Sequence, residues 1–330
     1  MLLRQTPVAL ALSALFPLLA NAQARNAADE ATRLGEITVS ATRTERATDA
    51  VPNTVTVYDK KRLQQRDARD LKDLLNGEVD LAVRAAAPRF TAAGASTGPA
   101  GNEGINIHGL EGNQVLMTLD GIRLPQAFSF GAFVSGRADY IDTDMLAGAE
   151  VLRGPASAQF GSDGLAGALS LRALAPEDLL VNGKTQAGLV SATHLGVDRS
   201  NKVSAAFAGR SGDWQGLLMA TVRRGHETQN MGENESPNRN RTAPNPADIR
   251  SDSVMGKVGL RIDGTQHLQA TIEACRRKID TEVLSGRAAT VPLMQLRFAS
   301  FVVTNLRRDL HPQVCAHVGH TKSALMLGAP

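Results

Sequence analysis

The chain has 330 residues, of which 42% are hydrophobic, a length that allows one or two globular domains. No run of 18 or more apolar residues follows the N-terminus, so a membrane-spanning helix is not expected. The 36 basic and 33 acidic residues give a formal net charge of +3 and are scattered, without the Lys/Arg clusters that follow a nucleic-acid backbone. We therefore expect no nucleic-acid partner.

Residues 1–24 have the pattern of a secretory signal peptide. Arg4 precedes an apolar run over residues 8–19, and small residues in an Ala-x-Ala arrangement follow as candidate cleavage sites. Export places the mature protein in an oxidising compartment, yet the chain has only two cysteines. We therefore expect no disulfide framework.

Residues 25–49 are expected to form a flexible arm, because their first part is polar, small and without periodicity. Within the arm, apolar and hydroxyl side chains alternate over a short segment that can be extended. Such a segment can add as a strand to the sheet edge of another protein, or form an ordinary edge strand of its own domain. The segment consists of Glu36, Ile37, Thr38, Val39, Ser40, Ala41 and Thr42.

Residues 50–178 have the pattern of a compact α+β domain. The run TVTVYD favours a strand, and the following DARDLKDLLNG places three leucines on one helical face before a glycine that can end the helix. Two further strands are expected over 105–108 and 114–119, with glycine-marked turns after each. Two stretches, 84–104 and 126–136, have no core-forming pattern and are expected to be loops.

The glycine-rich stretch VLRGPASAQFGSDGLAGALSL, residues 151–171, raises the possibility of a phosphate-binding loop. A phosphate loop of the G-x-x-x-x-G-K-[ST] type needs a Lys and a following Ser or Thr beside its glycines. This stretch has the glycines and no Lys. A nucleotide site is therefore not expected here.

Beyond residue 178 the apolar period becomes two. In SVMGKVGLRI the even-numbered residues from Val254 to Ile262 share an apolar face, and the odd-numbered residues from Met255 to Arg261 share a more polar one. HLQATIEA repeats this pattern, and a long polar loop over 225–250 contrasts with tight turns elsewhere. The combination is typical of a transmembrane β-barrel, but a soluble β-sandwich also alternates.

Three segments, in the expected order, resemble motifs of TonB-dependent outer-membrane receptors. EITVSAT resembles the TonB box, GINIHGLEGNQVLMTLDGIRLP the signature of the plug domain, and AEVLRGPASAQFGSDGLAGALSL the closing motif of the plug. The resemblance implies an α+β plug domain over 50–178, followed over 179–291 by antiparallel transmembrane β-barrel strands, the first of a 22-stranded barrel. It also implies that TonB, of the inner-membrane energising complex, binds residues 36–42.

Within this resemblance, the glycines of 151–171 belong to turns and close strand crossings of the plug. Arg153 and Glu150 are candidates for the charged pairs that seat a plug against the barrel wall. For each of them, a solvated surface charge is the alternative.

The plug signature most resembles that of receptors for haem or haem proteins. His108 and Gln114 stand where the family usually has Arg. Haem iron accepts His or Tyr as an axial ligand, so His108 is a candidate haem ligand, and a satisfied interior histidine is the alternative. Four aromatic side chains in the two plug loops can stack on a flat macrocycle and line the ligand vestibule: Phe90, Phe128, Phe130 and Phe133.

The chain also departs from the family pattern. Residues 180–330 can supply only six or seven strands of the 22 that such a barrel contains. After residue 291 the alternation is lost, and we interpret residues 292–330 as an aberrant or non-family tail, such as a truncation or frameshift leaves. Its histidines are spaced too irregularly around a single cysteine for a metal site, so no metal is expected.

The sequence therefore predicts a receptor, in a truncated form, that takes up iron as haem or haem proteins. The alternatives are a ferric-siderophore receptor and a non-transporting remnant with a soluble plug. No Ser/His/Asp, paired-carboxylate or metal-ligand arrangement has usable spacing, so an enzyme is not expected, and haem is a transported ligand and not a cofactor. The expected partners are TonB, the haem ligand and outer-membrane lipid, with the periplasm as the location if the chain cannot insert.

Overall fold

The computed structural model describes most of the chain between residues 37 and 325. The signal-peptide prediction and most of the predicted arm lie outside the described residues. The described ranges are 37–38, 46–47, 54–84, 104–126, 128–130, 133–135, 141–156, 163–238, 240–262, 266–282, 284–285, 294–307 and 310–325.

A five-stranded mixed sheet forms the framework of the first domain, which we call the α+β domain (described parts of residues 54–183). Its order is β3-β11-β12-β7-β8. The pairing of β12 with β7 is parallel and the other pairings are antiparallel. The bounds are β3 Thr54–Tyr58, β7 Val115–Leu119, β8 Ile122–Arg123, β11 Leu146–Arg153 and β12 Gly167–Ala173.

Two short helices cover the core of this domain. Helix α2 (Lys60–Arg66) begins at Asp59, whose side chain accepts a hydrogen bond from the Arg62 N–H, and α3 (Leu71–Leu75) begins at Asp70 in the same way. The three leucines expected on one helical face are buried in the core with residues of the sheet, which confirms that prediction. Each buried leucine contributes about 2 kcal/mol of hydrophobic stabilisation.

Smaller elements precede the domain or lie within it. A three-stranded sheet joins β4 (Leu81–Arg84), β5 (Gly104–Ile107) and β6 (Leu110–Glu111). Two-stranded pairs join β1 (Ile37–Thr38) to β2 (Arg46–Ala47), and β9 (Phe128–Phe130) to β10 (Phe133–Ser135). Short helical turns are η3 (Gly112–Gln114), η5 (Thr143–Met145), α6 (Pro176–Leu179) and η6 (Val181–Gly183).

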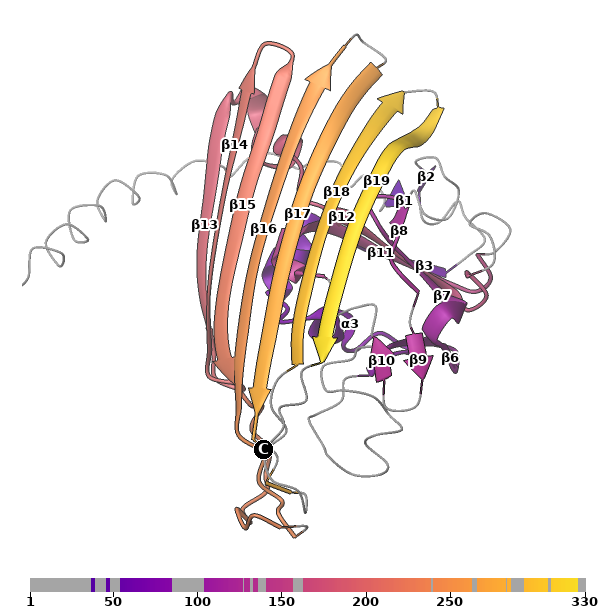
Figure 1. The fold of residues 1–330 in the computed structure, drawn as a ribbon. Helices are drawn as coiled ribbons and strands as arrows, with labels where there is room; N and C mark the ends of the chain where they lie inside the picture. The colour runs from indigo at the N-terminus through magenta and orange to yellow at the C-terminus, as the bar shows by residue number, and fades with distance from the viewer. Residues whose placement is uncertain are drawn as a thin grey trace, which may run out of the picture. The chain divides into compact units, whose positions relative to one another are not determined.

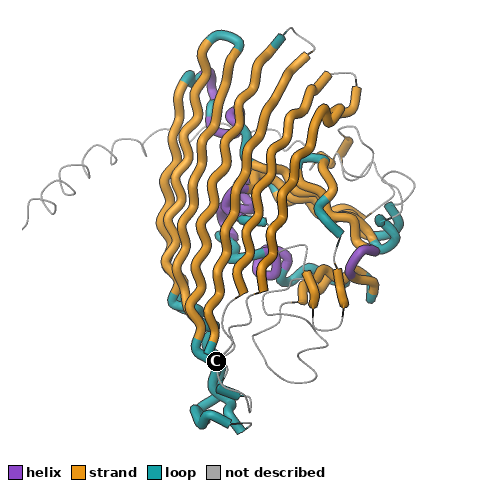
Figure 2. The backbone as a smooth tube through the Cα atoms, in the orientation of Figure 1, coloured by secondary structure: helices purple, strands orange, loops and turns teal. Residues whose placement is uncertain are grey.

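Seven long antiparallel strands follow in chain order and form one sheet, which we call the long sheet (Figures 1 and 2). The number agrees with the six or seven strands expected. Among the described strands β13 and β19 are the two edges, so the sheet is not a closed barrel and a 22-stranded barrel is not confirmed. The bounds are β13 Gln186–Leu195, β14 Ser200–Ser211, β15 Trp214–His226, β16 Ala247–Arg261, β17 Gln266–Thr281, β18 Met294–Arg307 and β19 Leu310–Leu325.

The long sheet extends beyond residue 291, where the sequence pattern ends. Strand β18 pairs with β17, and β19 pairs with β18 with two register irregularities. Main-chain hydrogen bonds form a ladder whatever the side chains are, so loss of alternation in the sequence does not mark the end of the sheet. The interpretation of 292–330 as a foreign tail remains a prediction.

The two faces of the long sheet have the polarity opposite to that of a soluble sheet. In β16, Val254 and Val258 are 49% and 50% exposed, whereas Met255 and Lys257 on the other face are 0% and 2% exposed. A soluble β-sandwich would bury its valines and expose its lysine. The alternation predicted from the sequence is correct, and its direction disagrees with the β-sandwich alternative.

In the part of the chain that the structure describes, no helix is both long enough and apolar enough to cross a membrane.

Candidate functional site at the contact between the α+β domain and the long sheet

The inner face of the long sheet is buried against the α+β domain and carries polar and charged side chains. Burying a charge is costly unless it is paired and hydrogen-bonded, so each buried cation of this face needs a partner. Small apolar residues and methionines pack around them. The buried polar side chains of this face are Ser200, Lys202, Ser204, Gln215, Thr221, Ser253, Lys257 and Glu273.

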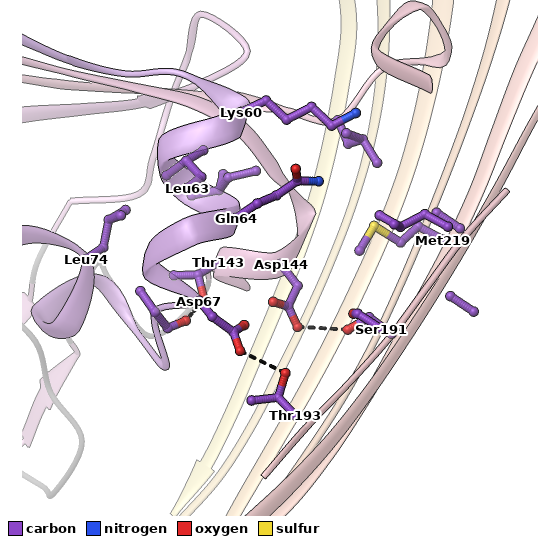
Figure 3. A pocket seen from close by; sticks show the side chains of 17 residues that line it. Lys60, Leu63, Gln64, Asp67, Leu74, Thr143, Asp144, Ser191, Thr193 and Met219 are labelled. Atoms are coloured by element: carbon purple, nitrogen blue, oxygen red, sulfur yellow. Dashed lines mark hydrogen bonds between the residues drawn. The ribbon is translucent and has the colours of Figure 1, made fainter. Parts of the chain in front are cut away.

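Lys202 of β14 bridges two carboxylates of the α+β domain. Its Nζ lies 2.6 Å from Asp67 Oδ1 and 2.7 Å from Asp144 Oδ1. The second oxygen of each carboxylate is also used, because Thr193 Oγ1 donates to Asp67 (2.8 Å) and Ser204 Oγ donates to Asp144 (2.8 Å). Figure 3 shows Asp67 pointing from the end of α2 towards Thr193 on the strand. Three side chains of the sheet thus hold two acids of the domain.

Local backbone structure places both acids. Asp67 caps the C-terminus of α2 with a left-handed φ of 42°, a conformation that Asp tolerates better than most residues. Asp144 lies in the first turn of η5. Burial alone would raise the pKa of Asp67, but hydrogen bonds from Lys202 and Thr193 outweigh it and lower the pKa below its usual value.

Lys257 of β16 makes a second attachment. Its Nζ lies 2.7 Å from Asp120 Oδ2 and 3.4 Å from the carbonyl oxygen of Ala173. Asp120 Oδ1 accepts the Ala173 N–H at 2.8 Å, so one carboxylate connects the turn after β7, the end of β12 and the long sheet. Asp120 and Gly121 both have positive φ, at 49° and 79°, which is the backbone of a tight hairpin turn.

Arg223 of β15 makes a third attachment. Its guanidinium donates to Asp198 Oδ2 (3.1 Å), Ser200 Oγ (3.0 Å) and the carbonyl oxygen of Arg69 (2.9 Å). Arg69 in turn lies 3.7 Å from Asp198. At the opposite strand ends, Gln215 donates to Glu177 of α6. The α+β domain is therefore attached to the sheet at several separate points.

A cavity of about 330 Å³ lies between α2 and strands β13–β15. Figure 3 shows Lys60, Gln64 and Asp67 directed into it from α2, and Met219 on the side of the sheet. Its walls carry both apolar and polar side chains. The helix is thus held to the sheet by the carboxylate at its end and not by close packing along its length.

Among the described residues, the side chain of Arg153 makes its hydrogen bonds inside the α+β domain, and its role in seating the domain against the barrel wall stays a prediction. Its guanidinium donates to Glu78 Oε2 (2.6 Å) and Thr56 Oγ1 (2.7 Å). Tyr58 also donates to Glu78, and burial together with Glu78 raises the pKa of Tyr58 to about 12. For Glu150, which lies in β11 opposite Val57 and Ser170, the seating role stays a prediction.

His108 is exposed, so the interpretation as a satisfied interior histidine is wrong. It occupies the turn between β5 and β6 with φ of 53°, followed by Gly109 at 86°. The pattern predicted a strand through residue 108, and the hairpin turn begins one residue earlier. His108 borders an open cavity with Asp80 and the pair of Glu78 and Arg153. Its role as a haem ligand remains a prediction.

The other predicted site residues lie wholly or partly outside the described residues. In the segment 36–42 only Ile37 and Thr38 are described, as a strand paired with Ala47 and Arg46. Phe90 is outside the description. For Phe128, Phe130 and Phe133 the structure describes only the backbone of their strands. Phe133 pairs with Phe130, and Phe128 pairs with Ser135.

Sequence reasoning missed Lys202, Lys257 and Arg223 as the attachment points. The alternation places Lys257 on the polar face of its strand. A lysine on a face that becomes covered needs an acidic partner, so the sequence contained a signal for this residue. No signal identified Asp67, Asp120 or Asp144, because their contacts join segments more than 50 residues apart.

The TonB-dependent Receptor Plug Domain family matches residues 47–168. The chain carries the plug domain of a TonB-dependent receptor. The chain is 30% identical, over 241 aligned residues, to lactoferrin-binding protein A of Neisseria meningitidis serogroup B. This alignment covers 69% of the chain and 24% of the relative, so the chain spans about a quarter of the relative's length.

Other relatives of the plug-bearing chain have names that refer to haem or haemoglobin. The hemin receptor of Yersinia enterocolitica is 27% identical, over 71% of this chain and 30% of the relative. The hemoglobin and hemoglobin-haptoglobin-binding protein A of Haemophilus influenzae is 27% identical, over 69% of this chain and 21% of the relative. All are receptors or binding proteins by name.

Solved structures share the fold of the plug and the strands after it. The FrpB iron transporter of Neisseria meningitidis superposes with a TM-score of 0.59 at 15% identity, over 76% of this chain and 37% of that chain. The siderophore receptor PirA of Acinetobacter baumannii superposes with a TM-score of 0.55 at 16% identity, over the same shares of the two chains. At these identities the likeness shows the fold alone.

Proposed function

We propose that the chain belongs to an outer-membrane receptor that takes up iron in the form of haem or haem proteins, with energy supplied through TonB. The observation that carries the proposal is the long sheet itself, whose apolar face is exposed while its charged face is covered by a plug domain. A receptor of this kind binds and transports, and it performs no covalent chemistry.

The exposed face suits a bilayer. Large apolar side chains on this face are 45–76% exposed over five neighbouring strands. A membrane-spanning strand needs about 9–11 residues when tilted, and strands β13–β17 contain 10 to 16. The apolar side chains are Val190, Val203, Phe207, Trp214, Leu218, Val222, Val254, Val258 and Ile272.

The covered face suits a plug that must stay attached and yet be removable. Polar attachments at Lys202, Lys257 and Arg223 lie beside an apolar cluster that the plug shares with the sheet, and a cavity remains beside α2. Segment 36–42, upstream of the plug, supplies the proposed strand for TonB, because main-chain hydrogen bonds to an extended segment require no particular side chain.

The names of the hemin and haemoglobin relatives support haem or a haem protein as the ligand. The plug loops 84–104 and 126–136 are proposed to line the vestibule, with Phe90, Phe128, Phe130 and Phe133 stacking on the macrocycle. Haem titration followed by the Soret band tests the ligand. A shifted band that His108→Ala abolishes would assign an iron ligand to the plug, and an unshifted band would place the iron ligands elsewhere.

Cell fractionation tests the membrane assignment. Cells that express the chain should contain it in the outer-membrane fraction, as a band whose gel mobility changes on heating because the folded sheet resists detergent. A soluble periplasmic species would contradict the proposal and support a non-transporting remnant.

A further inference from the structure

Glu273 of β17 is a buried acid that takes no part in the attachments described above. It is 5% exposed and lies on the covered face, opposite Met255 of β16 in the strand register. Met255 belongs to an apolar cluster that the plug shares with the sheet and that includes Met145 and Leu174. Among the described residues, no group forms a hydrogen bond or a salt bridge with the Glu273 carboxyl. Burying an ionised carboxylate without such partners is costly, so the neutral acid is the form that this position tolerates.

Two acids of the plug reach the wall on either side of Glu273. Lys257 and Ser253 occupy the two positions of β16 that are diagonal to it on the covered face. Lys257 Nζ lies 2.7 Å from Asp120 Oδ2, and Ser253 contributes a hydrogen bond to the Asp142 carboxyl. Diagonal side chains on neighbouring strands are within reach of each other, so both plug acids act on Glu273.

The charges around Glu273 do not balance. Asp120 and Lys257 form a neutral pair, whereas neither Glu273 nor Asp142 has a salt bridge within the part of the chain that the structure describes. Burial and the charge of the nearby Asp144 raise the pKa of Asp142 above its usual value. Two ionised carboxylates close together without a cation would repel each other, so a proton is held at this point of the contact.

The other neighbours of Glu273 supply no counter-charge. The thiol of Cys275, the next residue of this face on β17, accepts a hydrogen bond of 3.4 Å from the Ser253 hydroxyl. In the register of β18, Ser300 stands opposite Glu273. The nearest cation on this face of β17 is Arg277, four residues along the strand. Only a proton can therefore neutralise Glu273 while the plug is in place.

We propose that Glu273 carries a proton while the plug covers the sheet and releases it when the plug leaves, so that attachment of the plug is linked to protonation. Departure of the plug removes Asp120 and Asp142 from the strand and lets water reach the carboxyl. The O–H bond of Glu273 then breaks, the proton passes to water and the carboxylate is solvated. A rise in pH therefore weakens the attachment, and a fall in pH strengthens it. This inference rests on the proposed release of the plug from the sheet.

The test measures opening of the contact by labelling Cys275, which is 8% exposed on the covered face. The full chain carries C315S, which leaves Cys275 as its single thiol, and is refolded in detergent. The rate of maleimide labelling at each pH is divided by the rate for the same chain unfolded in urea, which removes the intrinsic pH dependence of the thiol. E273Q keeps the size of the side chain without its proton. The control D213N removes an acid from an exposed turn of the same sheet.

The labelling ratio of the C315S chain and of the control should rise by up to about tenfold per pH unit between about pH 5 and about pH 9, because one proton leaves on opening. The ratio for E273Q should stay constant. Parallel profiles with and without E273Q would overturn the proton link while leaving release of the plug intact. Complete protection of Cys275 at every pH would overturn the release of the plug and this inference together.

A second measurement needs no substitution at residue 273. Infrared spectra of a chain with isotope-labelled glutamate carboxyls distinguish a protonated glutamate from a protonated aspartate. A protonated glutamate band at neutral pH, lost as the pH rises and Cys275 becomes accessible, is the expected result. Absence of this band at neutral pH would overturn the proposal, even if E273Q does not fold.

Discussion

Strands of the α+β domain and of the long sheet share a two-residue period, but the domain buries its apolar side chains and the long sheet exposes them. In β4, Leu81 and Val83 pack against the core and Arg84 is exposed, whereas in β16 Val254 is exposed and Lys257 is buried. The domain follows the rule for a protein in water, and the sheet reverses it. The comparison shows that a period identifies a strand, while the surroundings of each face decide which residues are covered.

The largest effect should come from unpairing the buried face. Lys257→Met leaves the Asp120 carboxylate without its cation, and breaking one partner of a buried pair costs about 3–5 kcal/mol. The double variant K257M/D120N should recover much of this loss, because Asn keeps the acceptor for the Ala173 N–H without the charge. Urea unfolding in vesicles, followed by Trp214 fluorescence, measures both. Equal losses in the single and double variants would contradict a charge-paired attachment.

A second test places a charge on the exposed face. Leu218→Arg, at a position 61% exposed, should cost about 2–4 kcal/mol if lipid surrounds it. Val79→Arg is the matched control, since Val79 is 74% exposed on the α+β domain and an arginine there should change stability by less than about 0.5 kcal/mol. The same urea assay applies. A cost at residue 218 no larger than at residue 79 would mean that water covers both surfaces.

The sequence could predict the strands and not their surroundings. Alternation from Val254 to Ile262 identified β16, and three leucines identified α3, because these patterns are local. The sequence assigned His108 to the end of a strand, but in the structure this residue lies in a tight turn with positive φ. The acidic partners of Lys202 and Lys257 could not be predicted from the sequence. Asp67, Asp144 and Asp120 contact these lysines only after distant segments of the chain fold together.

A third test uses pH to weaken the attachment at Lys202. The pKa of Asp67 is lowered in the folded chain, so its stabilising effect is present above the unfolded pKa of about 4 and is lost as the pH falls through the lower folded value. The stability of the Asp67→Asn variant should therefore fall less between pH 5 and acid pH than the stability of the original chain. Acid unfolding curves of the two chains check this, and parallel curves would exclude Asp67 from the attachment.

The smallest structural effect is expected in the arm. Proline at Ile37 or at Val39 removes a main-chain donor, so strand addition to TonB should fail while the folded domains and ligand binding stay unchanged. The assay is iron uptake in a receptor that contains this chain within a complete barrel. Normal uptake by both proline variants would remove segment 36–42 from the coupling.

The central claim, that the long sheet has lipid on one face and the plug on the other, is tested most directly by moving the tryptophan. In W214F/L218W the single indole lies in the middle of the exposed apolar face, at a site with room for it. Our account predicts strong quenching by lipids brominated on their acyl chains and little quenching by aqueous iodide. Strong iodide quenching without bromolipid quenching would show that this face lies in water, and would contradict the claim.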